Sequence, residues 1–452
     1  MPPLAILVVA ILTVFLLIVR LRVNAFVALV TSAALIGVLS PKVPLADVMR
    51  ETAQRFGAVA GGIGIAIAMA AIIGQCLMES GAADKIIRRF VAWLGEKYSS
   101  LSLVVSGYVL AVPVFFDTVF YLLVPLARAM SVRMGGRNYV LYVLAISAGG
   151  SATHVFVPPT PGPLVMAATM QVDVGLVILV GLAVALPASF CGWLYCVWID
   201  RKLQIPIREA PGMSLAELQQ VADRPESELP GFWVSMLPIL LPVLLITSNT
   251  VANTLDRTSA VARFTTFLGD PNLSLLLAAV VALTVLATHK GYSLRQLSKP
   301  VETAIASAGI IILITSGGGA FGGMLVRAGV GDALGSLAKG AGLSHLLLGF
   351  LLAILFKIAQ GSSTVTMITV SSIMHPLVQA APPSYHVVYV VMAVGAGTLI
   401  GVWMNDSGFW IYRTMTGLNE IESLKTKSMV MAVLGTSAFA VTLALSRLLP
   451  LT

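Results

Sequence analysis

Residues 358–405 read IAQGSSTVTMITVSSIMHPLVQAAPPSYHVVYVVMAVGAGTLIGVWMN and contain no Asp, Glu, Lys or Arg. A helix that crosses the hydrocarbon core of a membrane needs roughly 20 residues, so this stretch is too long for one crossing. It must contain a turn inside the membrane or at its edge. Irregular backbone at that depth is tolerated only where protein buries it or where it lines a cavity. The stretch therefore predicts a membrane protein with interrupted helices.

The remainder of the chain has the same apolar character. Of its 452 residues, 58% are hydrophobic and 11% are charged, whereas soluble globular domains carry about 25% charged residues. Residues 174–199, 229–255 and 303–326 are further charge-free stretches long enough to span a bilayer. We predict an all-α polytopic membrane protein in contact with lipid. The N-terminal apolar run has no basic region before it and no small-residue cleavage site after it, so we expect a retained first span.

Charge and motif content exclude several classes of function. The net charge of +8 is typical of Lys and Arg in cytoplasmic loops, and we expect no nucleic-acid partner. The glycines at 317–323 are not followed by the GK[ST] of a phosphate loop. No metal-ligand cluster and no nucleophile with a paired base occurs in the sequence, and the three cysteines form no ligand or disulfide pattern. We expect no enzyme activity, no metal and no cofactor.

The chain divides into two similar halves. The polar segment 200–230 is the predicted cytoplasmic linker between membrane halves 1–199 and 231–452. GQCLMESGAADKI from Gly74 resembles GGMLVRAGVGDAL from Gly322, an offset of 248 residues. The same offset brings FFDTVF near GSSTV, and THVFVPP near GVWMNDSG. These coincidences predict an internal repeat.

Loop charges predict the topology. We place the loop cations in the cytoplasm, among them Lys85, Arg88, Arg89 and Arg128, and this leaves Arg50 and Arg55 outside. Residues 99–127 must then enter and leave on one side, as a re-entrant hairpin broken at 113–117. This leaves an odd number of crossings in the first half, so the second half is inverted. The ten expected crossings are 3–19, 24–40, 58–79, 139–171, 174–199, 232–252, 272–289, 303–326, 385–414 and 428–447, with a second hairpin at 345–376. Inverted repeats with broken helices are typical of secondary transporters, whose substrates bind near the midplane.

Isolated polar residues mark the predicted breaks in the first half. Asp117 lies in VPVFFDTVFYLLVP, and a carboxylate inside the membrane is costly unless it is protonated, paired or functional. His154 precedes a run of prolines that removes backbone donors and interrupts a helix. An imidazole there can titrate near neutral pH. Hairpin capping and ordinary packing are the structural alternatives for these two residues.

The second half has a comparable set. Asp406 and Asn405 lie in the expected counterpart of the His154 break, where a simple helix cap is the alternative. Lys357 is a lone cation that can pair with a carboxylate, attract an anionic substrate or extend its amine to the interface. We expect protons to be carried by Asp117, His154 or Asp406. We expect substrate to contact Asp117, Thr118, Thr153, His154, Thr160, Gln360, Gly361, Ser362, Ser363, Thr364, Asn405 and Ser407.

Together these segments resemble the gluconate permease (GntP) family of proton symporters, within the ion transporter superfamily. The distinctive parts are FFDTVF from Phe115, HVFVPPTPGP from His154, KIAQGSSTV from Lys357 and NDSGFW from Asn405. The resemblance implies proton-driven uptake of gluconate or a related hydroxy acid across a bacterial inner membrane, and the superfamily favours a homodimer.

The chain departs from the family pattern in three places. It has Thr160 where members often have His, Thr118-Val119 where they have Val-Gly, and Trp403-Met404 where a His is common. These departures surround the expected site, so they bear on the substrate rather than on the transporter class. A carrier of a small amino acid such as D-serine, and sodium coupling, stay open as alternatives.

Overall fold

The computed structural model describes residues 1–95, 98–208, 225, 228–256, 258–330, 333, 344–404 and 406–451. Within these residues, the regular secondary structure consists of helices. Those of the first half are α1 (Pro3–Phe15), α2 (Ala25–Leu39), α3 (Val48–Glu79), α4 (Ala82–Leu94), α5 (Ser99–Leu110), α6 (Phe116–Arg133), α7 (Tyr139–Phe156), α8 (Pro161–Met170) and α9 (Val174–Leu203). Those of the second half are α11 (Phe232–Leu255), α12 (Ala260–Leu268), α13 (Pro271–Lys290), α14 (Leu294–Arg327), α16 (His345–Gln360), α17 (Ser363–Ala380), α18 (Val388–Thr398), α19 (Ser407–Thr416), α20 (Glu420–Ser423) and α21 (Met429–Leu448). Short π-helical turns, η1 (Leu16–Arg20) and η5 (Leu424–Ser428), follow α1 and precede α21.

The order of elements recurs between the halves. Helices α2, α3, α5, α6, α7 and α8 are followed, about 248 residues later, by α13, α14, α16, α17, α18 and α19. Helices α3 and α14 form the most extensive helix pair and run antiparallel. Arg327 Nε lies 3.2 Å from Glu51 at one end of the pair, and Tyr292 Oη donates to Glu79 at 3.2 Å at the other. This recurrence is consistent with the predicted repeat.

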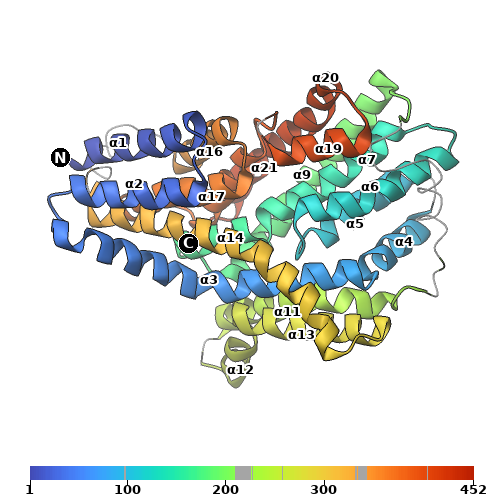
Figure 1. The fold of residues 1–452 in the computed structure, drawn as a ribbon, viewed down its shortest axis with the longest axis horizontal. Coiled ribbons are helices and arrows are strands. Elements are labelled where there is room, and N and C mark those ends of the chain that lie inside the picture. Colours follow the sequence, from blue (N-terminus) through green and yellow to red (C-terminus); the bar gives the residue numbers. More distant parts are fainter. Residues whose placement is uncertain are drawn as a thin grey trace.

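Two helical hairpins extend from opposite ends of the molecule toward its centre. Figure 1 shows α5 and α6 in one half of the view and α16 and α17 in the other. Helix α17 packs against α8, and α6 packs against α19. Each hairpin therefore contacts the short helix that follows the break in the other half, so the four interruptions meet at one place.

Seven of the described helical segments are long and apolar enough to cross a membrane: 45–79, 139–170, 174–203, 232–255, 271–290, 294–327 and 420–448. Large apolar side chains such as Leu186, Leu244 and Ile310 are exposed on these helices, as expected for surfaces in contact with lipid. Helices α1 and α2 correspond to the first two expected crossings but are shorter. The chain is therefore a multi-pass membrane protein.

Several expected boundaries were wrong. Helix α3 begins at residue 48 rather than 58, and α14 at 294 rather than 303, so Arg50 and Arg55 lie on helix instead of in a loop. The Glu51–Arg55 pair, four residues apart, supports the polar first turns of α3. The amphipathic helix α4 contains Lys85, Arg88 and Arg89, which were expected in a loop. Helix α12 was not expected. Residues 200–203 of the predicted linker extend α9.

Arg128 is a further correction, because the sequence placed it in a cytoplasmic loop. It lies within α6 and is fully buried. Its guanidinium donates to the carbonyls of Met415 at 2.7 Å and Arg208 at 2.5 Å, while Tyr139 Oη donates to the Thr416 carbonyl. The bonds to Met415 and Thr416 satisfy carbonyl groups at the end of α19 that have no partner within the helix, and the bond from Arg128 fixes α19 beside α6.

Candidate substrate-binding site

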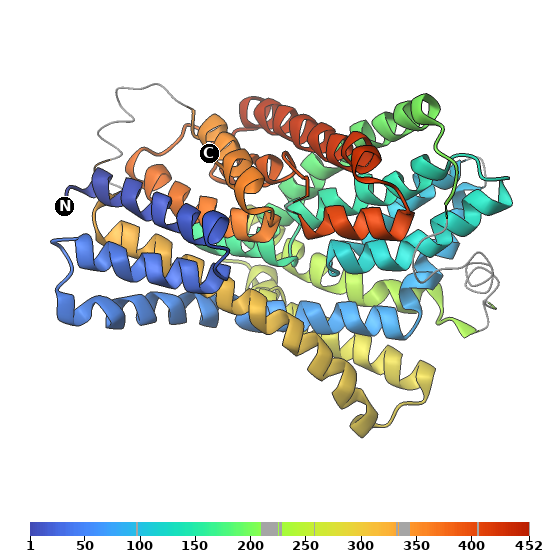
Figure 2. The ribbon, with the colours of Figure 1, turned by 45° about the horizontal axis from the view of Figure 1, so that its top comes forward.

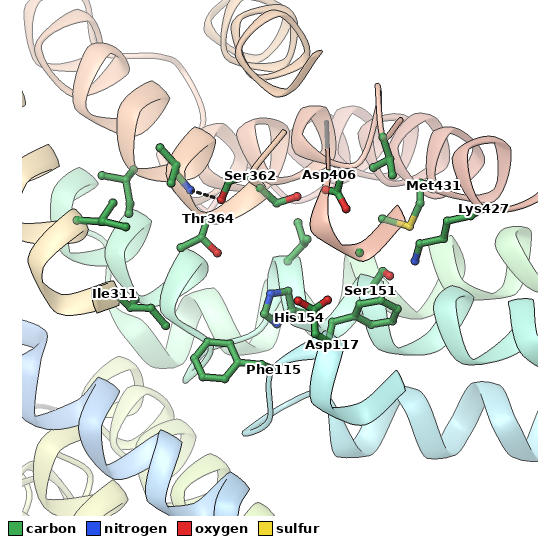
Figure 3. Close-up of a pocket in the computed structure, with 18 residues that line it drawn as sticks. Phe115, Asp117, Ser151, His154, Ile311, Ser362, Thr364, Asp406, Lys427 and Met431 are labelled. Carbon is green, nitrogen blue, oxygen red and sulfur yellow. Dashed lines mark hydrogen bonds between the residues drawn. The ribbon is translucent and has the colours of Figure 1, made fainter. Parts of the chain in front are cut away.

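A cavity of about 270 Å³ lies where the four interruptions meet. Both halves contribute to it, through the starts of α6 and α17, the end of α7, the segment before α19, and η5 (Figure 3). Its walls are mixed, with carboxylates, hydroxyls and an ammonium set among aromatic and aliphatic side chains. The residues that line it are Phe115, Phe116, Asp117, Ser151, His154, Val155, Ile311, Ile314, Ser362, Ser363, Thr364, Val365, Ile368, Val402, Asp406, Gly408, Lys427 and Met431.

Asp117 reaches the cavity from the first turn of α6. The helices of the hairpin are interrupted at residues 111–115, and α6 begins at Phe116. Asp117 is therefore helical, whereas the sequence predicted that it belongs to the break. A carboxylate in a first turn is stabilised by the positive end of the helix dipole. Its side chain is partly exposed to the cavity. Asp117 is thus a carboxylate available to a ligand or to a proton.

His154 lies in the last turn of α7, immediately before the predicted break. The Thr160 hydroxyl lies 2.9 Å from the His154 carbonyl and 2.7 Å from the Val157 carbonyl, within hydrogen-bonding distance of both, and Pro161 opens α8. Proline suits a first helical turn because its missing N–H would have no partner there. Neither His154 Nδ1 nor the Ser151 hydroxyl has a hydrogen-bond partner among the described residues. Buried polar atoms normally have one, so these two lining residues have hydrogen-bonding capacity that no described residue uses.

The second hairpin turns at Gly361 and Ser362. Gly361 has φ +86°, a conformation that favours glycine. The Ser362 hydroxyl caps α17 by accepting from Val365 N at 3.3 Å. Lys357 is fully buried beneath this turn, where its ammonium donates to the Gly361 carbonyl, to Ser363 Oγ at 3.0 Å and to Asp406 Oδ2. Lys357, which is isolated among apolar residues in the sequence, is therefore ion-paired.

Asp406 connects this pair to the start of α19. Its Oδ1 accepts from Phe409 N at 3.0 Å and caps the helix, so the capping reading holds for this residue. A Cβ built at Gly408 would lie 2.9 Å from Asp406 Oδ1 and 3.6 Å from Asp117 Oδ1. The two carboxylates, one from each half, therefore converge on Gly408, and a side chain at that position would crowd both.

Lys427 was not singled out from the sequence. It lies on η5 and is only 2% exposed, and Figure 3 shows its amine directed into the cavity. Its only sequence signal was a cation two residues before an apolar helix, a position where most lysines reach water. The π-helical turn instead directs this side chain inward.

The expected site residues separate into three groups. Asp117, His154, Ser362, Ser363, Thr364 and Asp406 line the cavity. Thr153 and Thr160 are buried and hydrogen bonded to backbone carbonyls, and Gly361 contributes its carbonyl to Lys357. Asn405, and the side chains of Thr118, Gln360 and Ser407, lie outside the described residues. The described residues contain no cluster of His, Cys, Asp or Glu that could hold a metal ion.

Comparison with known proteins places the chain among transporters. Residues 2–449 match the family model described as GntP family permease. A gluconate permease of Pseudomonas aeruginosa is 33% identical over 445 residues, covering 98% of this chain and 97% of that protein. The Gnt-II system L-idonate transporter of Escherichia coli is 32% identical over 429 residues, covering 94% of each chain.

A solved structure shares the fold. The Alcanivorax borkumensis YdaH transporter superposes with a TM-score of 0.61 at 15% sequence identity, covering 94% of this chain and 98% of that one. At this identity the likeness concerns the fold alone.

Proposed function

The chain belongs to the GntP permease family, and from this premise we propose that it takes up gluconate or a related small hydroxy acid together with a proton. Family membership confirms the resemblance seen in the sequence and the transporter class, as opposed to an enzyme. The relatives named for gluconate and L-idonate support a sugar acid as the substrate. We place the protein in a bacterial inner membrane.

The observation that supports this substrate class most directly is the set of unpartnered polar atoms in the cavity. Ser151 Oγ, His154 Nδ1 and Lys427 Nζ have no hydrogen-bond partner among the described residues, although all three residues line the cavity. A ligand that satisfied them would offer several hydroxyls and an anionic group. A sugar acid has this composition, and Ser362 and Thr364 extend the hydroxyl-rich wall.

The balance of formal charge supports proton coupling. At and immediately behind the cavity are two carboxylates, Asp117 and Asp406, and two ammonium groups, Lys357 and Lys427. These charges cancel, so an anionic substrate would leave a net negative charge inside the membrane, where uncompensated charge is expensive. One proton taken up with the substrate would remove that charge. We propose Asp117 as the residue that takes up this proton, because Asp406 is ion-paired. His154 is the second candidate.

The position of the cavity suits alternating access. Its wall combines helix ends from both halves, so relative movement of the halves would change which side of the membrane it faces. The unwound segments beside it allow backbone to rearrange without breaking helical hydrogen bonds.

Proteoliposomes containing the purified protein test the proposal. We expect radiolabelled gluconate to accumulate when an inside-alkaline pH gradient is imposed, and competition by unlabelled acids to rank the substrates. Asp117→Asn should abolish gradient-driven accumulation but retain exchange of labelled for unlabelled gluconate, because exchange requires no net proton movement.

Asp173→Asn is the matched control, since Asp173 caps α9 away from the cavity. It should leave both activities unchanged. Accumulation driven by a sodium gradient and indifferent to pH would contradict proton coupling. Gradient-driven uptake retained by Asp117→Asn would remove Asp117 from the proton role and direct the same test to His154→Ala and Asp406→Asn.

A further inference from the structure

Lys427 is a buried ammonium whose surroundings leave its hydrogen-bonding capacity unused. The residue is 2% exposed, and Nζ has no hydrogen-bond partner among the described residues. Its ammonium makes a cation–π contact with Phe116, whose ring centroid lies 4.1 Å from Nζ. A cation–π contact is attractive, but it covers one side of an ammonium that carries three N–H donors. Lys427 also lines the cavity, and Figure 3 shows its amine directed toward it.

Lys357, the other cation at the site, is not available to a ligand. Its ammonium already donates to a carbonyl, a hydroxyl and the Asp406 carboxylate, which is one acceptor for each N–H. It also lies beneath the hairpin turn and does not line the cavity. The only ammonium among the described lining residues is therefore that of Lys427.

The charged residues of the site have uncharged counterparts at the offset of the predicted repeat. At the offset of 248 residues, the counterpart of Lys427 is Leu179, and that of Lys357 is Val109. The counterparts of Asp117 and Asp406 are Val365 and Pro158. Leu179 lies on the regular helix α9 and is 40% exposed, whereas Lys427 is buried on the π-helical turn η5, so a buried cation at this position is particular to the second half. Asp117 and Asp406 lie near enough to offset part of the charge of Lys427, but neither accepts a hydrogen bond from its ammonium. A ligand-binding role therefore explains these unused donors better than packing does.

We propose that Lys427 binds the carboxylate of the substrate, a role that rests on the proposed transport of sugar acids and assigns one end of the substrate. A carboxylate accepting from an ammonium in a water-poor cavity forms a short, charge-assisted hydrogen bond. Phe116 and Met431 line the cavity beside Lys427 and lower the local polarity. Figure 3 shows Lys427 at one end of the cavity and Thr364 toward the other, with Asp117 and His154 between them. The hydroxylated chain therefore extends from η5 toward the tip of the α16–α17 hairpin.

Comparison of gluconate with gluconamide tests this assignment, because the amide keeps every hydroxyl and replaces the carboxylate by a neutral group. Each compound competes with radiolabelled gluconate for binding to purified full-length protein. Wild type should prefer gluconate to gluconamide by at least about tenfold, the size expected for loss of a buried charge-assisted contact. Lys427→Met should lower the affinity for gluconate by a similar factor and change the affinity for gluconamide by no more than about twofold. The preference for gluconate should therefore disappear. Where the labelled compound binds the variant too weakly, the shift in melting temperature replaces it as the readout.

Lys425→Met is the matched control, because Lys425 lies on the same π-helical turn but is exposed. It should keep the wild-type preference. If Lys427→Met does not fold because it leaves Asp117 without a nearby cation, Asp117→Asn and Asp117→Asn/Lys427→Met are compared instead, since the double variant keeps the charge balance. The first should prefer gluconate and the second should not.

Retention of the full preference in Lys427→Met, or in the double variant, overturns the assignment while leaving the proposed transport intact. Wild-type protein that binds neither compound overturns both.

Discussion

At the scale of single residues, Lys357 and Asp406 form a buried ion pair beside the cavity. The Lys357 side chain is 0% exposed and that of Asp406 is 14% exposed. Removing one partner of a buried pair leaves an uncompensated charge, which costs roughly 3–5 kcal/mol. We therefore expect Lys357→Met to lower the melting temperature of the detergent-purified protein markedly.

The double variant Lys357→Met/Asp406→Asn should recover more than half of that loss, because it removes both charges and because asparagine can still cap α19. Arg50→Met is the control, because the Arg50 side chain that pairs with Asp47 is 67% exposed. Exposed ion pairs contribute about 0–1 kcal/mol to the free energy of unfolding. A double variant no more stable than Lys357→Met would show that packing of the lysine stem, and not charge pairing, dominates.

The residues of the site were predictable to different degrees. Asp117, His154 and Asp406 stand out in the sequence because each interrupts a long uncharged stretch, and all three line the cavity. Lys427 does not, because Lys425 and Glu422 lie beside it and the group resembles an ordinary loop before a span. Only the local π-helical geometry, which no sequence pattern here signals, directs Lys427 inward and Lys425 outward.

At the scale of elements, the close approach of α5 and α7 determines where Ser151 and His154 lie. A Cβ at Gly149 would be 1.9 Å from the Val104 carbonyl oxygen, and a Cβ at Gly107 would be 2.8 Å from the Ile146 carbonyl oxygen. Both contacts are with backbone, so the helices themselves must separate to admit a side chain. Such overpacking typically costs about 1–3 kcal/mol, and sometimes more.

We expect Gly149→Ala to lower both the melting temperature and the affinity for gluconate, because the end of α7 would shift relative to α6. Gly61→Ala is the matched control, since Gly61 lies in α3 with nothing within 4 Å of its Cβ position. Alanine there should be neutral or stabilising by about 0.5–1 kcal/mol. Equal effects of the two substitutions would mean that backbone flexibility, rather than the α5–α7 contact, accounts for the loss.

The element boundaries were predictable where the sequence contains a strong interruption. Proline and glycine placed the breaks after α5, α7, α16 and α18 within a few residues of those observed. The polar ends of α3 and α14 were missed because an apolar run marks only the part of a helix that crosses lipid. Helix α4 was missed because its amphipathic pattern has charged residues, which were read as a loop.

At the scale of the whole molecule, the inverted orientation of the two halves is the prediction with the widest consequences. The antiparallel pairing of α3 with α14 places the start of α3 at one end of the molecule and the start of α14 at the other. Lys290, Arg295 and Lys299 lie around the α13–α14 junction at the latter end. In Figure 2 the end of α13 and the start of α14, both yellow, extend away from the other helices. Following the positive-inside rule, we expect this end to face the cytoplasm.

Single cysteines at the two ends test the assignment directly. Arg50 and Lys299 are exposed, so Arg50→Cys and Lys299→Cys can be introduced after Cys76, Cys191 and Cys196 have been replaced. In intact cells, a membrane-impermeant maleimide should label Cys at position 50 and reach position 299 only after permeabilisation. Labelling of both positions from outside would contradict the inverted arrangement, because the ends of α3 and α14 in question would then share one side. The reverse pattern would preserve the inversion but reverse its orientation, so the basic end would face outward against the charge rule.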